Sequence, residues 1–282
     1  MRVGIFSNPR KPDATRALEK VREAFHSKSV ELLFDSEAAD LIGERGTPDF
    51  WDGANLVISL GGDGTFLEAI HRMNGCPVPV AGVNIGRLGF LTACQDDEIR
   101  VLVEAFVNQK HVVIERSMLE VEMIARGGQC HSFVSLNEVV LMRGATGRLV
   151  SIEAKVDGEL LNRYRADGLI VATPTGSTAY SLAAGGPLVA PRAEVMLVTP
   201  ICPHSLSGRP LVLSDEAQVE LSPCGDGEEP ILFTVDGRDI LEVADNSVVR
   251  VRKAQDSLKL VRLPNHSFYE TLRRKLDWSG GV

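Results

Sequence analysis

The stretch Ser59-Leu60-Gly61-Gly62-Asp63-Gly64-Thr65-Phe66-Leu67-Glu68-Ala69-Ile70 places three glycines and one carboxylate between two regular elements. Residues 55–58 before it predict a buried strand, and residues 66–73 predict a helix. In open α/β sheets, ligands bind where such a strand ends and the chain turns into a helix. Glycines there let backbone N–H groups approach a phosphate closely, and the dipole of the following helix favours the same anion. The stretch therefore predicts a phosphate-binding turn.

The carboxylate of Asp63 is the unusual component of this turn. Beside a phosphate it is repulsive unless it meets a metal ion or removes a proton, and both roles suit phosphoryl transfer to an alcohol. The stretch matches neither G-x-x-x-x-G-K-[ST] nor G-x-G-x-x-G. A structural alternative stays open, in which Asp63 occupies a tight turn or caps the helix and the glycines serve geometry only.

The first part of the chain alternates strands and helices around this turn. Strands are predicted at 3–6, 30–34, 56–60 and 79–83, and further helices at 13–26 and 97–108. Such alternation is typical of a parallel sheet covered on both faces. We therefore predict an α/β domain with a parallel sheet over residues 1–114.

The pattern changes to period two after this domain. Residues 119–123, 249–252 and 258–261 alternate, and turns such as Asp157-Gly158 and Asp236-Gly237 separate short apolar runs. This predicts an all-β antiparallel C-terminal domain over residues 115–262. Helical spacing returns at 267–278, so we predict a tail of residues 263–282 whose helix packs back on the first domain.

Composition narrows the classes of partner. The chain has 282 residues and a net charge of −8, which disfavours nucleic acid and anionic membranes as partners. The start predicts a first strand rather than a secretory signal, and no apolar run approaches the roughly 20 residues of a membrane span. The five cysteines are scattered without a C-x-x-C pair, which argues against a disulfide framework or a zinc site. We therefore expect a cytoplasmic protein.

Several further motifs carry a resemblance to a known family. The turn 61–65 resembles the signature shared by NAD kinases, diacylglycerol kinases and 6-phosphofructokinases. Segments that resemble the NAD kinase family specifically are Asn84-Ile85-Gly86-Arg87-Leu88-Gly89-Phe90-Leu91-Thr92, Asn137-Glu138, 164–181 and 199–210. The resemblance runs from Val3 to the tail with the motifs in the family's order.

The resemblance implies an ATP-dependent kinase that phosphorylates the 2′-hydroxyl of the adenosine ribose of NAD to give NADP. Asp63 is then the catalytic general base, and Gly61, Gly62, Gly64 and Thr65 bind the phosphate donor. The residues implied in NAD binding are Asp63, Gly64, Asn137, Glu138, Arg148, Arg165, Asp167, Thr178, Ala179, Tyr180, Ser181, Leu182, Ala183 and Arg238. Asp167 is expected to reach the site of a neighbouring subunit.

The residues of the long motif make chemical sense without the resemblance. Residues 169–172 predict a buried strand, and 173–178 form a hydroxyl-rich turn suited to the edge of a base and its sugar. Tyr180 is suited to flanking a purine. The structural alternative is that Ser177 or Thr178 caps a helix starting at Ala179, with Tyr180 in the core.

Two positions depart from the commoner family pattern. Arg238 stands where many relatives carry Gln, which adds a positive charge if that position lines the site. Glu138 is one methylene longer than the commoner Asp.

The same resemblance implies the cofactor and the partners. We expect Mg²⁺ or another divalent cation, bound mainly through the nucleotide phosphates rather than by dedicated protein ligands. The partners are expected to be the small molecules NAD and ATP, with no nucleic acid and no membrane, in a homodimer or homotetramer. Two other functions stay open: a lipid or sphingoid kinase sharing the glycine turn, and a non-catalytic NAD(P)-binding sensor.

Overall fold

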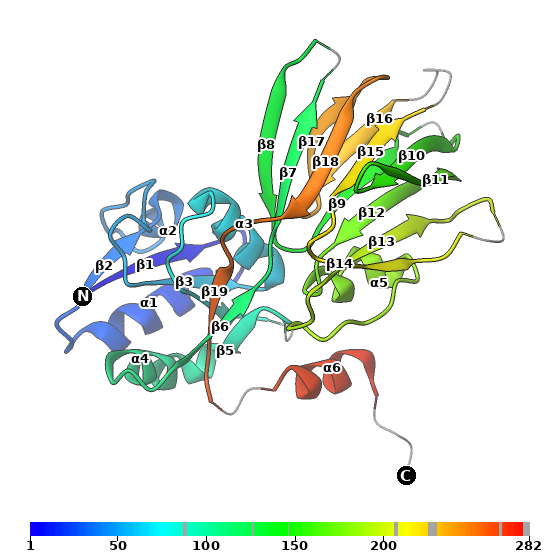
Figure 1. The fold of residues 1–282 in the computed structure, drawn as a ribbon. Coiled ribbons are helices and arrows are strands. Elements are labelled where there is room, and N and C mark those ends of the chain that lie inside the picture. Colours follow the sequence, from blue (N-terminus) through cyan, green and yellow to red (C-terminus); the bar gives the residue numbers. More distant parts are fainter. Residues whose placement is uncertain are drawn as a thin grey trace. The chain divides into compact units, whose positions relative to one another are not determined.

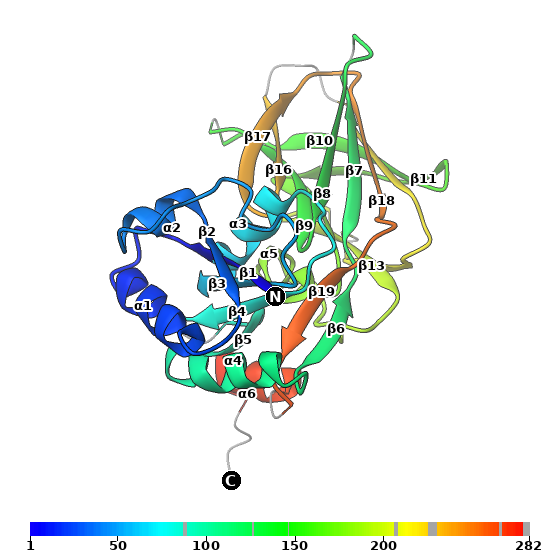
Figure 2. The ribbon, with the colours of Figure 1, turned by 90° about the vertical axis from the view of Figure 1, so that its left-hand side faces the viewer.

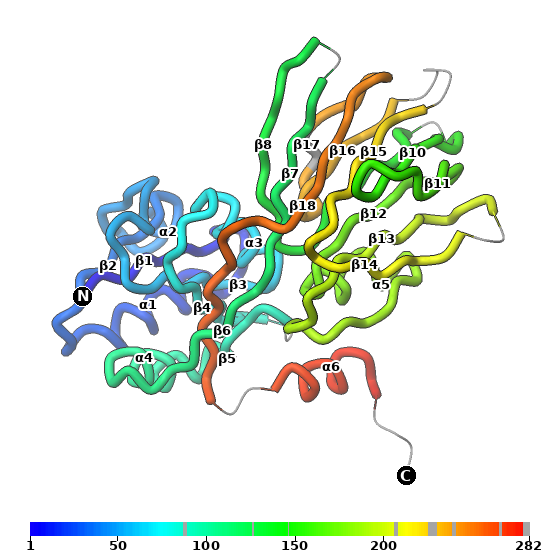
Figure 3. Tube along the Cα trace, in the orientation of Figure 1, coloured from blue at the N-terminus to red at the C-terminus, as the bar shows by residue number. Residues whose placement is uncertain are grey.

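The computed structural model describes residues 1–86, 89–125, 127–145, 147–205, 208–224, 230–264 and 267–278. The chain divides into two compact units, drawn in Figure 1. One unit comprises Met1–Glu115 together with Leu258–Val282, and the other comprises Arg116–Ser257. Figure 3 follows the single trace as it leaves the first unit after β6 and returns to it with β19.

The first unit is built on a sheet of strand order β2-β1-β3-β4-β19-β6, with β5 paired to β4. Its strands are β1 (Arg2–Ser7), β2 (Glu31–Phe34), β3 (Leu56–Gly61), β4 (Val80–Asn84), β5 (Thr92–Gln95), β6 (Val112–Arg116) and β19 (Leu258–Arg262). Strands β1 to β5 pair in parallel, and Val57 of the central β3 stands level with Gly4 and Val80. The predicted parallel sheet is therefore confirmed.

Helices cover both faces of this sheet. They are α1 (Ala14–Phe25), α2 (Ser36–Asp40), α3 (Asp63–Met73) and α4 (Ile99–Val107, after the short 3₁₀ helix Asp96–Glu98). Helix α6 (Phe268–Leu276) also belongs to this unit and contacts the loop after β4, where the Phe268 and Phe90 rings lie 6.2 Å apart. Figures 1 and 2 show α1 and α4 on one face and α3 on the other. Val3, Ile58 and Leu18 are fully buried between the layers, because a parallel strand sandwiched by helices is apolar on both sides.

The position of strand β19 shows that the predicted end of the β domain at residue 262 is wrong. The sequence prediction placed 258–262 in the β domain because those residues alternate. The structure instead inserts β19 into the first sheet, where Leu260 pairs in parallel with Val80. Leu260 and Val261 are both fully buried, so this strand is covered on both faces despite its alternating start.

The second unit contains two antiparallel sheets among its described residues. The first, of order β11-β10-β15-β18-β7-β8, consists of β7 (Leu119–Ile124), β8 (Cys130–Ser135), β10 (Val150–Val156), β11 (Glu159–Ala166), β15 (Val219–Pro223) and β18 (Val248–Lys253). The second, of order β14-β13-β12-β9-β16-β17, consists of β9 (Glu138–Arg143), β12 (Gly168–Ala172), β13 (Val195–Ile201), β14 (Leu211–Ser214), β16 (Ile231–Val235) and β17 (Arg238–Val243). One apolar core joins their inner faces, with Val121, Ile152 and Phe233 at its centre, as the predicted all-β domain requires.

Among the residues the structure describes, no helix combines the length and the apolar character needed to cross a membrane.

Candidate functional site

The glycine turn forms the start of helix α3. The helix begins at Asp63 with Gly62 as its N-cap, three residues earlier than the sequence predicted, and its first backbone bond runs from Phe66 N–H to Gly62 O at 3.0 Å. The N–H groups of Asp63, Gly64 and Thr65 therefore have no partner within the helix. Together with the helix dipole they form a site for an anion at the end of β3.

The glycines of the turn are required for different reasons. A Cβ on Gly61 would lie 2.2 Å from Thr65 Oγ1, so the fold itself demands glycine there. A Cβ on Gly62 or Gly64 would meet no atom within 4 Å. Neither of these two has a positive φ value. The chain does not need glycine at these two positions, and the open space beside them is available to a ligand.

The carboxylate of Asp63 turns away from the helix it starts and is held by a neighbouring loop. Oδ2 accepts the Phe90 N–H and Oδ1 accepts the Leu91 N–H, each at 2.9 Å. Lys275 Nζ of α6 lies 3.5 Å from Oδ2. The N-cap of α3 is Gly62 and the Asp63 oxygens bond the loop instead, so the capping alternative raised from the sequence is wrong. The side chain remains 29% exposed, which leaves it accessible to a substrate.

The motif 84–92 forms the loop that holds the Asp63 carboxylate in place. Ile85 N–H donates to Gly61 O at 3.0 Å, which fixes the loop beside the turn. A Cβ on Gly89 would lie 2.2 Å from Asp63 Oδ1, so only glycine leaves room for the carboxylate there. Arg87 and Leu88 of this motif lie outside the described residues.

In the second unit, Asp236 gathers motifs that lie about 100 residues apart in the sequence. Its carboxylate accepts the Ser135 hydroxyl at 2.7 Å and the backbone N–H groups of Leu136, Asn137 and Glu138 at 2.8 to 3.1 Å. Its own N–H donates to Glu138 O. The Asn137-Glu138 pair is thereby fixed at the start of β9.

The side chain of Glu138 is buried beside this carboxylate. It is 5% exposed, and its Oε2 has no hydrogen-bond partner. Burial, and secondarily the charge of Asp236, raise the pKa of Glu138 to about 8, while the Tyr180 N–H lowers it. Glu138 is therefore protonated at neutral pH and offers a buried O–H donor.

This protonation makes stability depend on pH. The folded state retains the proton that the unfolded chain releases above its ordinary pKa of 4.5, so stability is highest below that value and is lost as pH rises toward about 8. We expect Glu138→Gln to remove a slope of up to about 1.4 kcal/mol per pH unit between pH 5 and 8. Urea unfolding of both proteins at each pH tests this. Equal slopes in the two proteins would contradict the assignment.

The hydroxyl-rich turn after β12 packs onto the Asn137 segment. Thr173 Oγ1 donates to Leu136 O at 2.6 Å, and Thr173 N–H donates to Asn137 O at 2.9 Å. The turn continues as a 3₁₀ helix (Gly176–Thr178) and helix α5 (Tyr180–Ala183). Its residues 178–180 are half-buried. The structure therefore brings Thr178, Ala179 and Tyr180 to the same end of the sheet as Asn137 and Glu138.

Neither Ser177 nor Thr178 caps helix α5, contrary to the structural alternative raised from the sequence. Its N-cap is Ala179, which makes no side-chain cap bond. Ser177 Oγ instead donates to Pro174 O at 2.6 Å, and Thr178 Oγ1 donates to Thr175 O at 3.1 Å. These hydroxyls therefore stabilise the turn rather than the helix.

The remaining residues of this helix differ in exposure. Ser181 is buried and bonds with Thr199 at 3.0 Å, whereas Leu182 is half-buried and Ala183 is exposed. Tyr180 packs on the sheet face, and its pKa is raised by burial and then by the nearby Cys202 and Asp167.

The other predicted NAD-binding residues are divided between the two ends of this sheet. Asp167 immediately precedes β12 and Arg148 follows β9, at the ends of these antiparallel strands opposite to Glu138 and Thr173. Arg165 is exposed on β11 beside them. Arg238 is exposed at the start of β17 and stands opposite Val235, which pairs with Val139, so it lies at the Glu138 end of the sheet. One end of the sheet thus holds Asn137 and Glu138 and the opposite end holds Asp167, while burial and then the charges of both Asp167 and Glu138 raise the pKa of Tyr180.

The sequence did not single out Arg143, which pairs with Asp167. Its Nε donates to Asp167 Oδ1 at 2.7 Å, and its backbone N–H donates to Asp167 O at 2.9 Å. A local sequence motif could not predict this pair, because the two residues are 24 positions apart and only the fold of β9 brings Arg143 beside Asp167.

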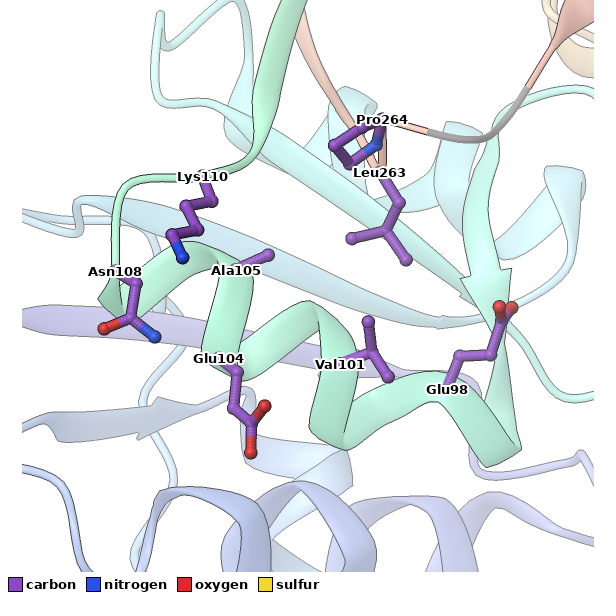
Figure 4. A pocket seen from close by; sticks show the side chains of 8 residues that line it. All are labelled: Glu98, Val101, Glu104, Ala105, Asn108, Lys110, Leu263 and Pro264. Atoms are coloured by element: carbon purple, nitrogen blue, oxygen red, sulfur yellow. The ribbon is translucent and has the colours of Figure 1, made fainter.

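A separate pocket of about 320 Å³ lies along α4. Figure 4 shows Val101, Ala105 and Leu263 on its walls. None of the predicted site residues lines it. It is therefore distinct from the glycine turn.

Comparison with known proteins agrees with the two-part organisation. The ATP-NAD kinase N-terminal domain family matches residues 3–111, and the ATP-NAD kinase C-terminal domain family matches residues 136–263. A protein of Gemmatimonas aurantiaca named NAD kinase is 39% identical over 99% of this chain and 97% of its own length. One of Syntrophotalea carbinolica with the same name is 36% identical over 98% of both.

Two solved structures share the fold. Yeast NADH kinase complexed with NADH superimposes with a TM-score of 0.93 at 26% identity, covering 100% of this chain and 89% of its own. An NAD kinase from Archaeoglobus fulgidus in complex with ATP gives a TM-score of 0.77 at 24% identity, covering 98% and 99%. The second likeness supports the fold.

Proposed function

This chain belongs to the NAD kinase family, and from that premise we propose that it transfers the γ-phosphate of ATP to the 2′-hydroxyl of the adenosine ribose of NAD, giving NADP. The observation that carries the proposal is a fixed, accessible Asp63 carboxylate beside unpaired N–H groups at the start of α3. A coupled assay of NADP formation from ATP with NAD or NADH tests it. NADH is included because the yeast relative is an NADH kinase.

Asp63 acts as the general base of this reaction. Oδ1 accepts one backbone N–H at 2.9 Å and retains a lone pair for the ribose hydroxyl, whereas Oδ2 accepts the Phe90 N–H and faces Lys275. The fixed carboxylate removes the hydroxyl proton as the oxygen attacks the γ-phosphorus, and ADP leaves. Because phosphoryl transfer depends mainly on positioning and charge neutralisation, the rigid mounting of Asp63 matters as much as its basicity.

The donor phosphates lie on the N–H groups of the glycine turn. Gly62 and Gly64 have open space where a side chain would be, whereas Thr65 is buried with its hydroxyl against Gly61. Gly64→Ala provides the test, because alanine in a helix stabilises by up to about 1 kcal/mol over glycine. We expect Gly64→Ala to keep or raise the melting temperature while weakening ATP binding at least about tenfold, measured by calorimetric titration.

Gly75→Ala is the matched control, because Gly75 has open space too but lies beyond the far end of α3, at a φ of +78°. It is expected to lower the melting temperature without changing the ATP affinity. Unchanged ATP binding in Gly64→Ala would show that the glycines serve backbone geometry only.

A divalent cation, Mg²⁺ in the first instance, is expected to accompany the donor. The described residues contain no cluster of three or more metal-ligating side chains, and the carboxylate oxygens of Asp63 are the protein oxygens that fit a cation at the turn. A cation held by the nucleotide phosphates would neutralise their charge there.

The dinucleotide is bound by the second unit. Asn137, Glu138, Thr178, Ala179 and Tyr180 form one group at the start of β9 and the end of β12. Asp167 lies at the opposite end of these strands from Glu138, and its reach to the site of a neighbouring protomer in a homodimer or homotetramer is proposed from the family resemblance. The five cysteines are free thiols, which supports a cytoplasmic location.

The two remaining alternatives separate in the same assay. A lipid kinase would phosphorylate diacylglycerol rather than NAD, and a sensor would bind NAD without ATP-dependent formation of NADP. The family match over both units favours the dinucleotide.

A further inference from the structure

Arg262, at the end of β19, is a buried cation at the back of the loop that holds Asp63. The residue is 6% exposed. Its guanidinium donates to Phe90 O at 2.7 Å and to Thr92 O at 3.3 Å, while its Nε has no hydrogen-bond partner. A buried guanidinium that bonds only to two carbonyl oxygens costs folding free energy unless an opposite charge compensates its own.

The charge that compensates Arg262 is that of Asp63. Among the described residues, no carboxylate forms an ion pair with the guanidinium, and the nearby Asp63 charge counteracts the fall in the Arg262 pKa that burial causes. A second cation among the described residues, Lys275 of α6, lies 3.5 Å from Asp63 and is 31% exposed. Lys275 also lies over the Phe90 ring, 4.7 Å from its centroid.

One peptide unit connects the two charged groups directly. Its carbonyl, that of Phe90, accepts from Arg262, and its N–H, that of Leu91, donates to Asp63 Oδ1 at 2.9 Å. Hydrogen bonds in such a chain polarise one another, so the cation strengthens the donor that the carboxylate receives. The same contact fixes the plane of that peptide, and therefore the direction of the Leu91 N–H.

We propose that Arg262 is a positioning residue of the phosphoryl transfer, which orients the Asp63 carboxylate through the Phe90–Leu91 peptide. This inference rests on the proposed function, because it assigns Arg262 a part in the work of Asp63. The guanidinium does not touch substrate. Its effect belongs to the orientation of the base and therefore to kcat, not to the affinity for ATP or NAD.

The test is a double-mutant cycle between Arg262 and Asp63. Arg262→Met removes the charge and both hydrogen bonds at similar volume, and it is measured alone and together with Asp63→Asn, using radiolabelled ATP at saturating substrate. We expect Arg262→Met to lower kcat about 10- to 100-fold with the dissociation constants of ATP and NAD within about twofold. In the Asp63→Asn background we expect it to change the residual turnover less than about twofold.

Val261→Ala is the matched control, because Val261 is fully buried in the same strand and carries no charge. It should lower the melting temperature and have the same small effect on kcat in both backgrounds. Arg262→Lys retains the charge but not the two-pronged geometry, so it should recover part of the lost turnover.

Each outcome decides the matter. An equal loss of turnover from Arg262→Met in both backgrounds would mean that the residue only stabilises the fold. If Arg262→Met does not fold, Arg262→Lys decides in its place, since wild-type kcat in that variant overturns the proposal. A wild-type protein that forms no NADP rejects the proposed function itself, before any variant is compared.

Discussion

Asp63→Asn is expected to lower the kcat for NADP formation by about 10²- to 10⁴-fold, the range that general-base catalysis contributes. Asparagine cannot take up the hydroxyl proton, and its amide NH₂ would face one of the two backbone N–H groups that now bond the carboxylate. Because the phosphates and the dinucleotide are held by other groups, the dissociation constants of ATP and NAD should stay within about threefold. Initial rates and calorimetric titrations of the variant measure both.

Glu68→Gln is the control, because Glu68 is a carboxylate of the same helix. It lies 3.5 Å from Arg72. Its kcat should remain close to the wild-type value. Near-normal turnover in Asp63→Asn would remove the base assignment, and loss of ATP binding in that variant would make Asp63 part of the donor site instead.

The sequence predicted the first sheet well because buried parallel strands and amphipathic helices leave a clear periodicity. It failed at β19, where alternation suggested an antiparallel strand but the pairing partner decided the sheet. Helix α2 was missed because it is only five residues long. Such short elements are specified by tertiary contacts, here by Asp35, which accepts the Glu37 N–H and pairs with Arg72 at 2.8 Å.

The candidate site was predictable where a motif is contiguous, as for the glycine turn and the Asn137-Glu138 pair. The residues that hold those motifs were not predictable, because they come from distant strands. Arg262 reaches the Asp63 loop across 172 positions, and Asp236 reaches Asn137 across 99. Sequence spacing carries no sign of such contacts, which only the register of the sheets creates.

Asp236→Ala is expected to destabilise the protein by at least about 3 kcal/mol, because it leaves three buried N–H groups and one hydroxyl without their acceptor. Those N–H groups belong to the segment that carries Asn137 and Glu138, so NAD affinity should fall more than about tenfold. Urea unfolding and titration with NAD measure the two effects.

Asp157→Ala is the matched control for this loss. Asp157 also precedes a glycine in a hairpin turn and also has a positive φ, but it is exposed and accepts a single N–H, that of Gln218. Its removal should cost about 1 kcal/mol or less and leave NAD affinity unchanged. A similar cost in the two variants would mean that the turn conformation, common to both, and not the buried carboxylate accounts for the effect.

Asp236→Asn separates charge from hydrogen bonding at the same position. Its amide oxygen can replace Oδ1, which accepts from Ser135, Asn137 and Glu138, so it should be less destabilising than alanine. It also removes the negative charge that helps to raise the pKa of Glu138. The loss of stability with rising pH should therefore end at a lower pH than in the wild type. An unchanged pH profile would show that burial alone keeps Glu138 protonated and that the two carboxyl groups are not coupled.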